Sequence, residues 1–350
     1  MAALREGFTT GSCAAAAALA CCLWQTEGEC PRRVEIVLPE GRAYAPDIVP
    51  HEGGLCGVVK DSGDDPDVTN GAEIIAHVAV LPGDGEIEFA AGDGVGIVTL
   101  PGLKIPPGQP AINPIPREMI TRAVRSVYGA RRVKVTLSIP GGREIALRTF
   151  NPRLGIEGGL SILGTSGVVR PMSEEALRDS LYEELKMRAA QGKKSLIFTF
   201  GNQGESALSA LFPGACIVQV SNELGFMLDA AEALGVTHLL IGGHPGKLSK
   251  VAAGVMNTHS KYADARREAL VTHLALLGAD RALLAQVYDC VTTDAAIALI
   301  HRAGFDRVWT ALARAAQRCC TLRTHGKIQI QILFTDAAGH VLGGTTEGLQ

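Results

Sequence analysis

Short apolar, β-branched stretches alternate with turn-forming clusters from residue 34 to residue 148. This pattern predicts strands at VEIVL, CGVVK, EIIAHVAVL, EIEFAA, GIVTL, VKVTLSI and REIALRTF. One helix interrupts them: after the proline-rich residues 113–116, a helical run extends from Arg117 to about Tyr128 and ends at Gly129. The first half of the chain is therefore predicted to be α+β, with mostly antiparallel strands.

An alanine-rich stretch near the start predicts a further helix. Thr9, Thr10 and Ser12 surround Gly11 just before it, and Ser12 is the expected N-cap. Small side chains would let this helix approach a sheet closely, and its free N-terminal amides could bind a carboxylate or a phosphate. Capping alone explains the hydroxyl groups equally well, so both interpretations stay open.

A glycine-rich tract from residue 151 to residue 172 joins the two halves of the chain. It carries too many large apolar side chains for a flexible linker, which predicts an ordered crossover or a ligand loop. The helix that follows is capped by Ser173 and stopped by Gly192. We place the domain boundary near this helix, giving an α+β domain at residues 1–190 and a second domain at residues 191–350.

The pattern changes after Lys194. SLIFTF, ACIVQV and THLLIG are short apolar strands, each followed by a glycine-containing loop and a helical stretch, which is typical of parallel α/β structure. Further helices are predicted from about residue 261 to residue 323, before a last strand at KIQIQILF. The second domain is thus expected to be a small four-stranded sheet, parallel or mixed, covered by helices.

The net charge and the length of the apolar runs limit the classes of partner that we expect the chain to bind. A formal net charge of -3 over 350 residues gives no general attraction to nucleic acid or to an anionic membrane. The longest apolar run, from Cys13 to Trp24, is too short to span a bilayer and lacks the basic flank of a signal sequence. We expect a cytoplasmic chain without nucleic-acid or membrane partners. Its nine cysteines show no CxxC spacing and are expected to be reduced and mostly buried.

The loops that follow the predicted parallel strands are the strongest candidates for ligand binding. GNQGES, SNELG and GGHPGK should lie along one edge of the sheet, where the carboxyl ends of the strands meet. Glycine allows close approach of the backbone, and Glu205 and Glu223 could accept ribose hydroxyls, which favours a nucleoside-like ligand. The candidate cofactor-binding residues are Gly201, Asn202, Gly204, Glu205, Ser221, Asn222, Glu223, Gly242, Gly243 and His244.

Two phosphate-binding patterns are only superficially present. The glycines at 92, 94 and 96 precede β-branched residues where a dinucleotide fingerprint needs a helix, which indicates a hairpin or a bulge. GHPGKLSK misplaces the first glycine of a P-loop.

The polar cluster NTHS at 257–260 interrupts an apolar stretch near Lys247 and Lys250, and we interpret it as ligand-facing rather than as a solvated helix surface. We expect no metal ligation there.

The stretch KDSGDDPDVTNG, residues 60–71, carries four aspartates within seven positions. Its register does not fit a calcium loop and Pro66 interrupts it, so no metal site is expected. A turn between two strands explains Pro66 and the closing Asn70-Gly71, but not the density of carboxylates. Either these carboxylates pair with Lys60 and nearby arginines, or one of them faces a reacting centre.

Several long motifs together resemble one protein family. LREGFTTGSCAAAA, KDSGDDPDVTNG, GDGVGIVTLPGL with QPAINPIPR, NPRLGIEGGLSILGTSGVVRPMS and GGHPGKLSKVAAGVMNTHSKYADAR are similar to the CbiD family, the cobalt-precorrin-5B C1-methyltransferases of anaerobic cobalamin biosynthesis. The resemblance covers almost the whole chain. Two positions depart from it: Ser12 stands where the family usually has Thr, and Leu100 where it usually has Lys.

The resemblance implies both a fold and a reaction. The implied fold is an α+β domain resembling a permuted ribosomal-protein-S5 domain-2-like fold, followed by a four-stranded parallel α/β domain. The implied reaction is transfer of a methyl group from S-adenosylmethionine to C1 of a cobalt-corrinoid tetrapyrrole, giving cobalt-precorrin-6A. Cobalt then belongs to the substrate only. We expect the donor in the loops of the second domain and the tetrapyrrole between the domains.

The chemistry of this acceptor suggests roles for particular side chains. It carries many carboxylates, which basic and polar groups must hold. Asp61, Asp64 or Asp65 could accept a proton or organise the reacting face. Candidate substrate-binding residues are Arg5, Thr9, Thr10, Ser12, Lys60, Lys104, Asn113, Arg117, Arg153, Arg170, Lys247, Lys250, Asn257 and His259. A phosphate-ligand enzyme related to small-molecule kinases and a non-catalytic tetrapyrrole carrier remain alternatives, and a homo-oligomer is compatible with the sequence.

Overall fold

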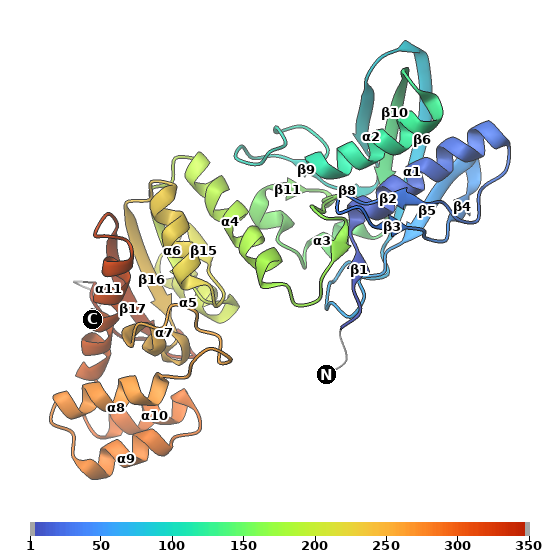
Figure 1. The fold of residues 1–350 in the computed structure, drawn as a ribbon. Helices are drawn as coiled ribbons and strands as arrows, with labels where there is room; N and C mark the ends of the chain where they lie inside the picture. Colours follow the sequence, from blue (N-terminus) through green and yellow to red (C-terminus); the bar gives the residue numbers. More distant parts are fainter. Residues whose placement is uncertain (1–3, 347–350) are drawn as a thin grey trace. The chain divides into compact units, whose positions relative to one another are not determined.

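The computed structural model of the protein describes residues 4–346. It divides into two compact units, Met1–Ala176 and Leu177–Gln350 (Figure 1). The sequence suggested a division at residue 190, and the difference is helix α4, Glu174–Ala190. Leu181 and Leu185 of this helix are buried, and the Tyr182 ring lies 6.5 Å from that of Phe226 in the second unit. Most of α4 therefore belongs with the second unit.

The first unit contains a five-stranded sheet in the order β4-β5-β6-β10-β7. Neighbouring strands are antiparallel except for β10 and β7, which run parallel. The alternation of apolar and turn residues therefore predicted this sheet correctly as mostly antiparallel. The strands are β4 (Val49–His51), β5 (Leu55–Val59), β6 (Glu73–Asp84), β7 (Ile87–Ala91) and β10 (Arg131–Ser138).

Two helices pack beside this sheet, α1 (Thr10–Glu27) and α2 (Pro114–Tyr128). Figure 1 shows them running close together, and α1 contacts β5, β6 and α2. Alanines make the close approach feasible, and a Cβ on Gly11 would lie 2.8 Å from Pro116 of α2. The expected N-cap at Ser12 is wrong. The helix begins earlier, and the Thr9 hydroxyl accepts a hydrogen bond from the Ser12 amide at 3.2 Å.

The tract at 151–172 is ordered, as its apolar side chains predicted. Ile156, Leu160, Ile162 and Val168 are buried. Its short strands pair with segments far away in the sequence: β11 with β9, β12 with β8, and β13 with β1. These elements, with the nearby hairpin β2-β3, are β1 (Gly7–Phe8), β2 (Ile36–Val37), β3 (Ala43–Tyr44), β8 (Gly94–Val95), β9 (Ile97–Val98), η2 (Asn151–Leu154), β11 (Ile156–Glu157), β12 (Gly159–Leu160) and β13 (Val168–Val169).

One predicted strand is a helix. REIALRTF was expected to extend the sheet, but it contributes to α3, Gly142–Ala146. Gly142 and Ala146 are buried four residues apart, which is the helical period, and Gly141 before them has a positive φ of 70°. No helix follows the glycines at 92, 94 and 96 directly, since β9 comes next. The interpretation of that segment as a hairpin or bulge is consistent with this arrangement.

The second unit contains a five-stranded sheet in the order β15-β14-β16-β17-β18. The first four strands are parallel, and β18 pairs with β17 antiparallel. The predicted four-stranded sheet is therefore wrong in strand number. The short antiparallel edge strand β18 adds a fifth strand, which the sequence did not indicate. The strands are β14 (Ser195–Thr199), β15 (Ile217–Gln219), β16 (His238–Gly243), β17 (Gln329–Thr335) and β18 (Val341–Gly344).

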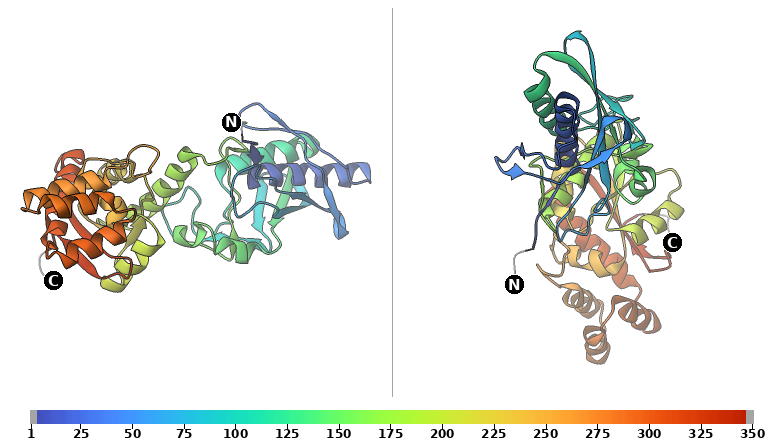
Figure 2. Two further views of the ribbon diagram at one scale, coloured as in Figure 1. Left: turned by 90° about the horizontal axis from the view of Figure 1, so that it is seen from below. Right: turned by 90° about the vertical axis from the view of Figure 1, so that its right-hand side faces the viewer.

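Helices cover this sheet, as predicted. Leu208 of α5 packs with Ile197, Leu240 and Leu333 of the sheet, whereas Trp309 of α11 lies 5.9 Å from the Phe334 ring, which points to the opposite face. The helix α9 packs against α8 and α10, and α8 also contacts α7 and α11; Figure 2 shows these helices from two further sides. The bounds are α5 (Asn202–Leu211), α6 (Leu224–Ala233), α7 (Pro245–Ala252), α8 (Arg266–Leu276), α9 (Arg281–Asp289), α10 (Thr293–Arg302) and α11 (Arg307–Arg323).

Two general expectations can be compared with these elements. None of the nine cysteines forms a disulfide in the structure, and five of the nine are buried. No helix within residues 4–346 combines the length and apolar character that a membrane span requires.

Candidate functional site

The second unit has a point where the chain order of its sheet reverses. From β14 the chain passes through α5 to β15 on one side, and then through α6 to β16 on the other side. In open parallel sheets such a switch point leaves a crevice outside the carboxyl ends of the two central strands, where ligands bind. Here those ends are Thr199 and Gly242, which are paired in register. The three loops singled out from the sequence all begin along this edge.

Glycines allow α5 to pack closely against the ends of β14 and β16 at the switch point. A Cβ on Gly204 would lie 2.2 Å from the Thr199 hydroxyl oxygen, and one on Gly242 would lie 2.7 Å from the Leu208 side chain. Gly201 stands at the N-cap of α5 and has no side chain to cap the helix. The first amides of a ten-residue helix are thus left for another acceptor.

Thr199 supplies a second, independent sign of a ligand. Its side chain is fully buried, and its hydroxyl oxygen has no hydrogen-bond partner among residues 4–346. A buried hydroxyl without a partner costs about 1–3 kcal/mol. Because this hydroxyl lies beside Gly204, at the start of α5, a ligand bound at the switch point could supply the missing partner. Thr199 carries no signal in the sequence, because only the fold shows that its hydroxyl lacks a partner.

Gln219 joins the polar residues at the start of α5. It is the last residue of β15, and its side-chain amide donates to Asn202 Oδ1 and to Glu205 Oε2, both at 2.7 Å. This amide therefore fixes two of the candidate residues relative to the sheet. Sequence reasoning missed Gln219, because only the pairing of β14 with β15 brings it to α5.

The next loop is held by a buried carboxylate. Glu223 is 4% exposed, and its two oxygens accept from Arg178 Nε at 2.7 Å and from Asn257 Nδ2 at 2.8 Å. Ser221 has a positive φ of 51°, uncommon for a residue other than glycine. Glu223 therefore ties α4 and residue 257 to the end of β15. This geometry suits a positioning role better than the expected contact with ribose.

The residues at the start of α7 differ in their access to the switch point. His244 caps α7, accepting from the Gly246 amide at 3.2 Å, and its Nε2 lies 3.0 Å from Asp294 Oδ1. Lys247 donates from Nζ to the Phe200 carbonyl at 3.3 Å, at the end of β14. Burial, and secondly repulsion from Lys250, lower the pKa of Lys247. Lys247 is thus a cation that reaches the crevice.

Lys250 and the NTHS cluster make hydrogen bonds within the second unit. Lys250 is buried and donates to the Thr258 and Ala263 carbonyls, each at 3.0 Å. Asn257 Oδ1 accepts from the His259 amide at 3.0 Å. These bonds hold the segment in place beside the end of β15, where Asn222 O accepts from the Thr258 amide. The geometry therefore favours a scaffold role for Lys250 over the expected direct contact with substrate.

In the first unit, the aspartate-rich stretch connects β5 to β6, as its turn residues predicted. Lys60 is 2% exposed, and its Nζ donates to Asp67 Oδ2 at 2.6 Å. Burial alone would raise the pKa of Asp67, but the charge and hydrogen bond of Lys60 and two bonds from Thr69 hold it below its ordinary value. The buried ammonium of Lys60 and the partly exposed carboxylate of Asp67 therefore form an ion pair within this loop.

The other three aspartates also have partners within the unit. Asp61 pairs with the Arg5 guanidinium, Asp64 accepts from the Arg5 amide at 2.6 Å, and Asp65 accepts from the Met172 amide at 2.9 Å. Hydrogen bonds from Arg5 and from the Gly63 amide lower the pKa of Asp61. A carboxylate with a lowered pKa is a weak proton acceptor. The contacts thus favour an organising role for these side chains.

The hydroxyls near the start of α1 are buried. Thr10 accepts from the Leu163 amide at 2.9 Å, Ser12 donates to the Gly167 carbonyl at 2.6 Å, and Thr9 caps the helix. They fasten α1 to the tract at 151–172. The contacts therefore support the interpretation of these hydroxyls as groups that cap the helix and make local hydrogen bonds.

The remaining basic candidates occupy different parts of the first unit. Arg170 lies 3.3 Å from Glu40 and 3.5 Å from Glu6, and Arg153 is in η2. Asn113 precedes α2 and makes no capping bond with its side chain. Lys104 and Arg117 line one hollow of about 330 Å³. These residues are not gathered at one point, so only some of them can contact the same group of a ligand.

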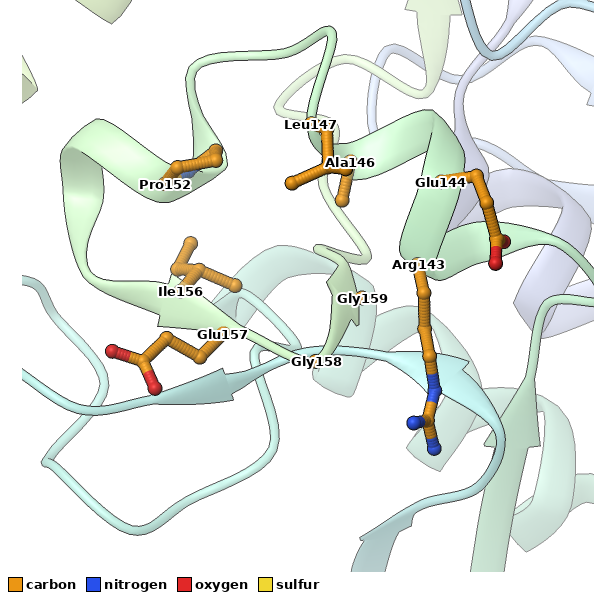
Figure 3. Close-up of a pocket in the computed structure, with 9 residues that line it drawn as sticks. All are labelled: Arg143, Glu144, Ala146, Leu147, Pro152, Ile156, Glu157, Gly158 and Gly159. Atoms are coloured by element: carbon orange, nitrogen blue, oxygen red, sulfur yellow. The ribbon is translucent and has the colours of Figure 1, made fainter.

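A second hollow of about 400 Å³ lies between α3 and the tract that follows it. Figure 3 shows the apolar side chains of Ala146, Leu147, Pro152 and Ile156 around its middle, with Arg143 and Glu157 at its edge. In the described part of the chain, no cluster of three or more His, Cys, Asp or Glu side chains is arranged to hold a metal ion.

Comparisons with known proteins cover nearly the whole chain. The sequence profile of CbiD matches residues 1–171, and that of the CbiD C-terminal domain matches residues 257–346. A protein of Alkaliphilus metalliredigens named cobalt-precorrin-5B C(1)-methyltransferase is 46% identical over 96% of this chain and 91% of its own length. One of the same name from Moorella thermoacetica is 40% identical over 97% of this chain and 94% of its own. A crystal structure of a cobalamin biosynthesis protein (cbiD) from Archaeoglobus fulgidus is 29% identical, covering 76% of this chain and 84% of that chain, with a TM-score of 0.40.

Proposed function

Because the chain belongs to the CbiD family, we propose that it methylates C1 of cobalt-precorrin-5B in cobalamin biosynthesis. The named relatives are 40–48% identical and span most of their own length with this chain. The coarser conclusion, a methyltransferase, follows from those names. The acceptor, the donor and the product, cobalt-precorrin-6A, are the finer parts of the proposal.

The methyl donor is proposed to be S-adenosylmethionine, bound at the switch point of the second unit. The observation that carries this assignment is the unpartnered hydroxyl of Thr199 beside Gly204 and the uncapped start of α5. A hydroxyl, helix amides and the amine of Lys247 suit a ligand that carries a carboxylate and ribose hydroxyls. The residues present therefore fit this group.

The donor, when bound, supplies a methyl group on a sulfonium sulfur, which an electron-rich ring carbon can take in one in-line displacement. The protein then needs no nucleophile of its own. The amides of α5 and Lys247 would hold the donor's carboxylate, while Asn202 and Glu205, fixed by Gln219, would orient its hydroxyls. Glu223 would not contact the donor itself but would position residue 257 and the end of β15.

The aspartates of the loop at 60–71 are proposed to organise that loop. Each makes a bond within the first unit, and Asp61 has a lowered pKa. Replacing Asp61, Asp64 and Asp65 one at a time by Asn should therefore leave kcat within a few-fold of the parent. A loss of about a thousandfold in kcat at one position, with the melting temperature unchanged, would instead assign that carboxylate a role in proton transfer.

A transfer assay separates the proposal from its two alternatives. Purified protein is incubated with methyl-labelled S-adenosylmethionine and cobalt-precorrin-5B, and the corrinoid is analysed for label. Label in the corrinoid supports the methyltransferase. Corrinoid binding without transfer would indicate a carrier, and magnesium-dependent nucleotide binding without transfer would indicate a kinase-like enzyme. The Thr199→Val variant should lose donor affinity in calorimetry, and unchanged affinity would refute the switch-point assignment.

A further inference from the structure

A hollow of the first unit combines positive charge with apolar walls. It measures about 330 Å³ and is lined by Lys104, Ile105, Pro106, Gln109, Ile112, Pro114 and Arg117. Two cations are among these residues, and no carboxylate is. The sequence suggested Lys104 and Arg117 separately as substrate contacts, and the fold brings them to one hollow.

Arg117 is held rigidly at this hollow. Its Nε donates to the Ile112 carbonyl at 2.8 Å and its Nη2 to the Pro110 carbonyl at 3.2 Å. The guanidinium also lies 5.1 Å from the centre of the Phe89 ring. These contacts fix one edge of the guanidinium and leave its Nη1 end for another acceptor. A donor fixed in advance loses little freedom when it binds.

The charges of this pair are uncompensated. Within residues 4–346, neither Lys104 nor Arg117 forms an ion pair with a carboxylate. Burial lowers the pKa of Arg117, which means that its positive charge is partly withdrawn from water without a negative partner. An anion in the hollow would supply that partner. By comparison, Arg5 and Arg170 of the same unit both pair with carboxylates.

The walls indicate which kind of anion fits. Ile105, Pro106, Ile112 and Pro114 provide apolar surface, and proline has no backbone N–H to donate to a phosphate. A short hydrocarbon stem that ends in a carboxylate matches both the walls and the two cations. A tetrapyrrole macrocycle is too large for 330 Å³, whereas one of its acetate or propionate side chains is not.

We propose that the Lys104–Arg117 hollow binds one carboxylate side chain of the corrinoid acceptor and thereby sets how the ring is oriented. The proposal rests on the proposed function for the identity of the acceptor. Its residues take no part in the chemical step. Substitutions at Lys104 and Arg117 should therefore weaken acceptor binding and leave donor binding unchanged.

The test is the Kd for cobalt-precorrin-5B, measured by absorbance titration without a methyl donor. Lys104→Gln should weaken binding about 3- to 10-fold, since it removes an exposed charge, and Lys104→Arg should restore it. Arg117→Gln should weaken binding about tenfold or more. Lys134→Gln is the matched control, because Lys134 is an exposed lysine on β10 outside the hollow, and it should stay within twofold.

A chemical variant of the ligand tests the carboxylate itself. Esterification of the acceptor's carboxylates should weaken binding to the parent protein and abolish the difference between the parent and Lys104→Gln. If Lys104→Gln and Arg117→Gln both bind like Lys134→Gln, the proposal is overturned. Since Arg117→Gln also loses two backbone bonds, its melting temperature is recorded, and Lys104→Gln decides the matter if that variant unfolds.

Measuring both Kd and methyl transfer distinguishes failure of the hollow proposal from failure of the proposed function. Normal methyl transfer with equal Kd values for Lys104→Gln and Lys134→Gln refutes the hollow alone. A selective loss in Lys104→Gln without any methyl transfer by the parent keeps the hollow and refutes the reaction. No binding of the corrinoid by the parent protein overturns both.

Discussion

The ion pair between the buried Lys60 and the partly exposed Asp67 permits a quantitative prediction for the aspartate-rich loop. Asp67→Asn keeps the shape of the side chain and its acceptor for Thr69, which donates to Oδ1 from its amide at 2.8 Å and its hydroxyl at 2.7 Å. It removes the negative charge that faces Lys60 Nζ at 2.6 Å. Lys60, only 2% exposed, is then left as a buried cation without its partner.

The size of the effect follows from the burial of the two side chains. Breaking a fully buried ion pair by removing one partner costs about 3–5 kcal/mol. Asp67 is 24% exposed, so water can replace part of the lost interaction. We therefore expect the free energy of unfolding of the first unit to fall by about 2–3 kcal/mol. For a unit of this size, that corresponds to a melting temperature lower by about 5–10 °C.

The assay is thermal and urea unfolding of the full chain, followed by circular dichroism. Asp61→Asn is the control, because the Asp61 side chain is 51% exposed and pairs with Arg5 at the surface, so its loss should change stability little. Combining Asp67→Asn with Lys60→Met should recover much of the loss, since the buried cation is removed as well. Equal melting temperatures for Asp67→Asn and Asp61→Asn would refute the reasoning.

The pH dependence of this effect has a definite sign. The pKa of Asp67 is lower in the folded protein than its ordinary value of 3.8, so the unfolded chain takes up the proton first. The stability that this carboxylate contributes is therefore fully present above about pH 4 and is lost as the pH falls through the lower, folded pKa. The difference between the parent and Asp67→Asn should shrink over that acidic range. A difference that grew with acidity would contradict the pairing.

Three further predictions concern the switch point. Thr199→Val should leave thermal stability unchanged or slightly higher, because a buried hydroxyl without a partner is removed, while donor affinity in calorimetry falls about 5- to 10-fold. Gly204→Ala would place a methyl group 2.2 Å from the Thr199 hydroxyl, so the start of α5 must shift and donor binding should fall; unchanged binding would show that the start of α5 does not hold the donor. Lys247 should lose its proton below the ordinary pKa of 10.5, so donor affinity should fall as the pH rises into that range, and Lys247→Met should remove this pH dependence.

The sequence predicted those parts of the fold that depend on local pattern. Apolar runs with intervening glycine loops identified β14, β15 and β16, and the rule for parallel strands then placed their loops along one edge. Local pattern failed where it was ambiguous. REIALRTF was interpreted as a strand, but its first residues belong to α3, in which the preceding Gly142 and Ala146 are buried with helical spacing. The short strand β18 carries too little apolar sequence to stand out.

The candidate site was predicted less completely, because side-chain roles depend on distant neighbours. Gln219 meets Asn202 across 17 positions, and Arg178 meets Glu223 across 45, so neither could be found from spacing along the chain. Burial is equally hard to predict from local sequence. Lys60 and Lys250 were predicted as ligand-binding cations, but their burial and internal hydrogen bonds favour a scaffold role. Only the three-dimensional structure separates them from Lys104.

The most direct test of the proposed function is a turnover experiment with S-adenosylmethionine that carries a ¹³C-labelled methyl group. Purified protein is mixed with cobalt-precorrin-5B, and the position of the label in the corrinoid is determined by NMR. One labelled methyl group per corrinoid, attached to C1, is the expected result. Label at another carbon, or a corrinoid that remains unlabelled although the protein binds it, would show that the protein does not catalyse methylation at C1.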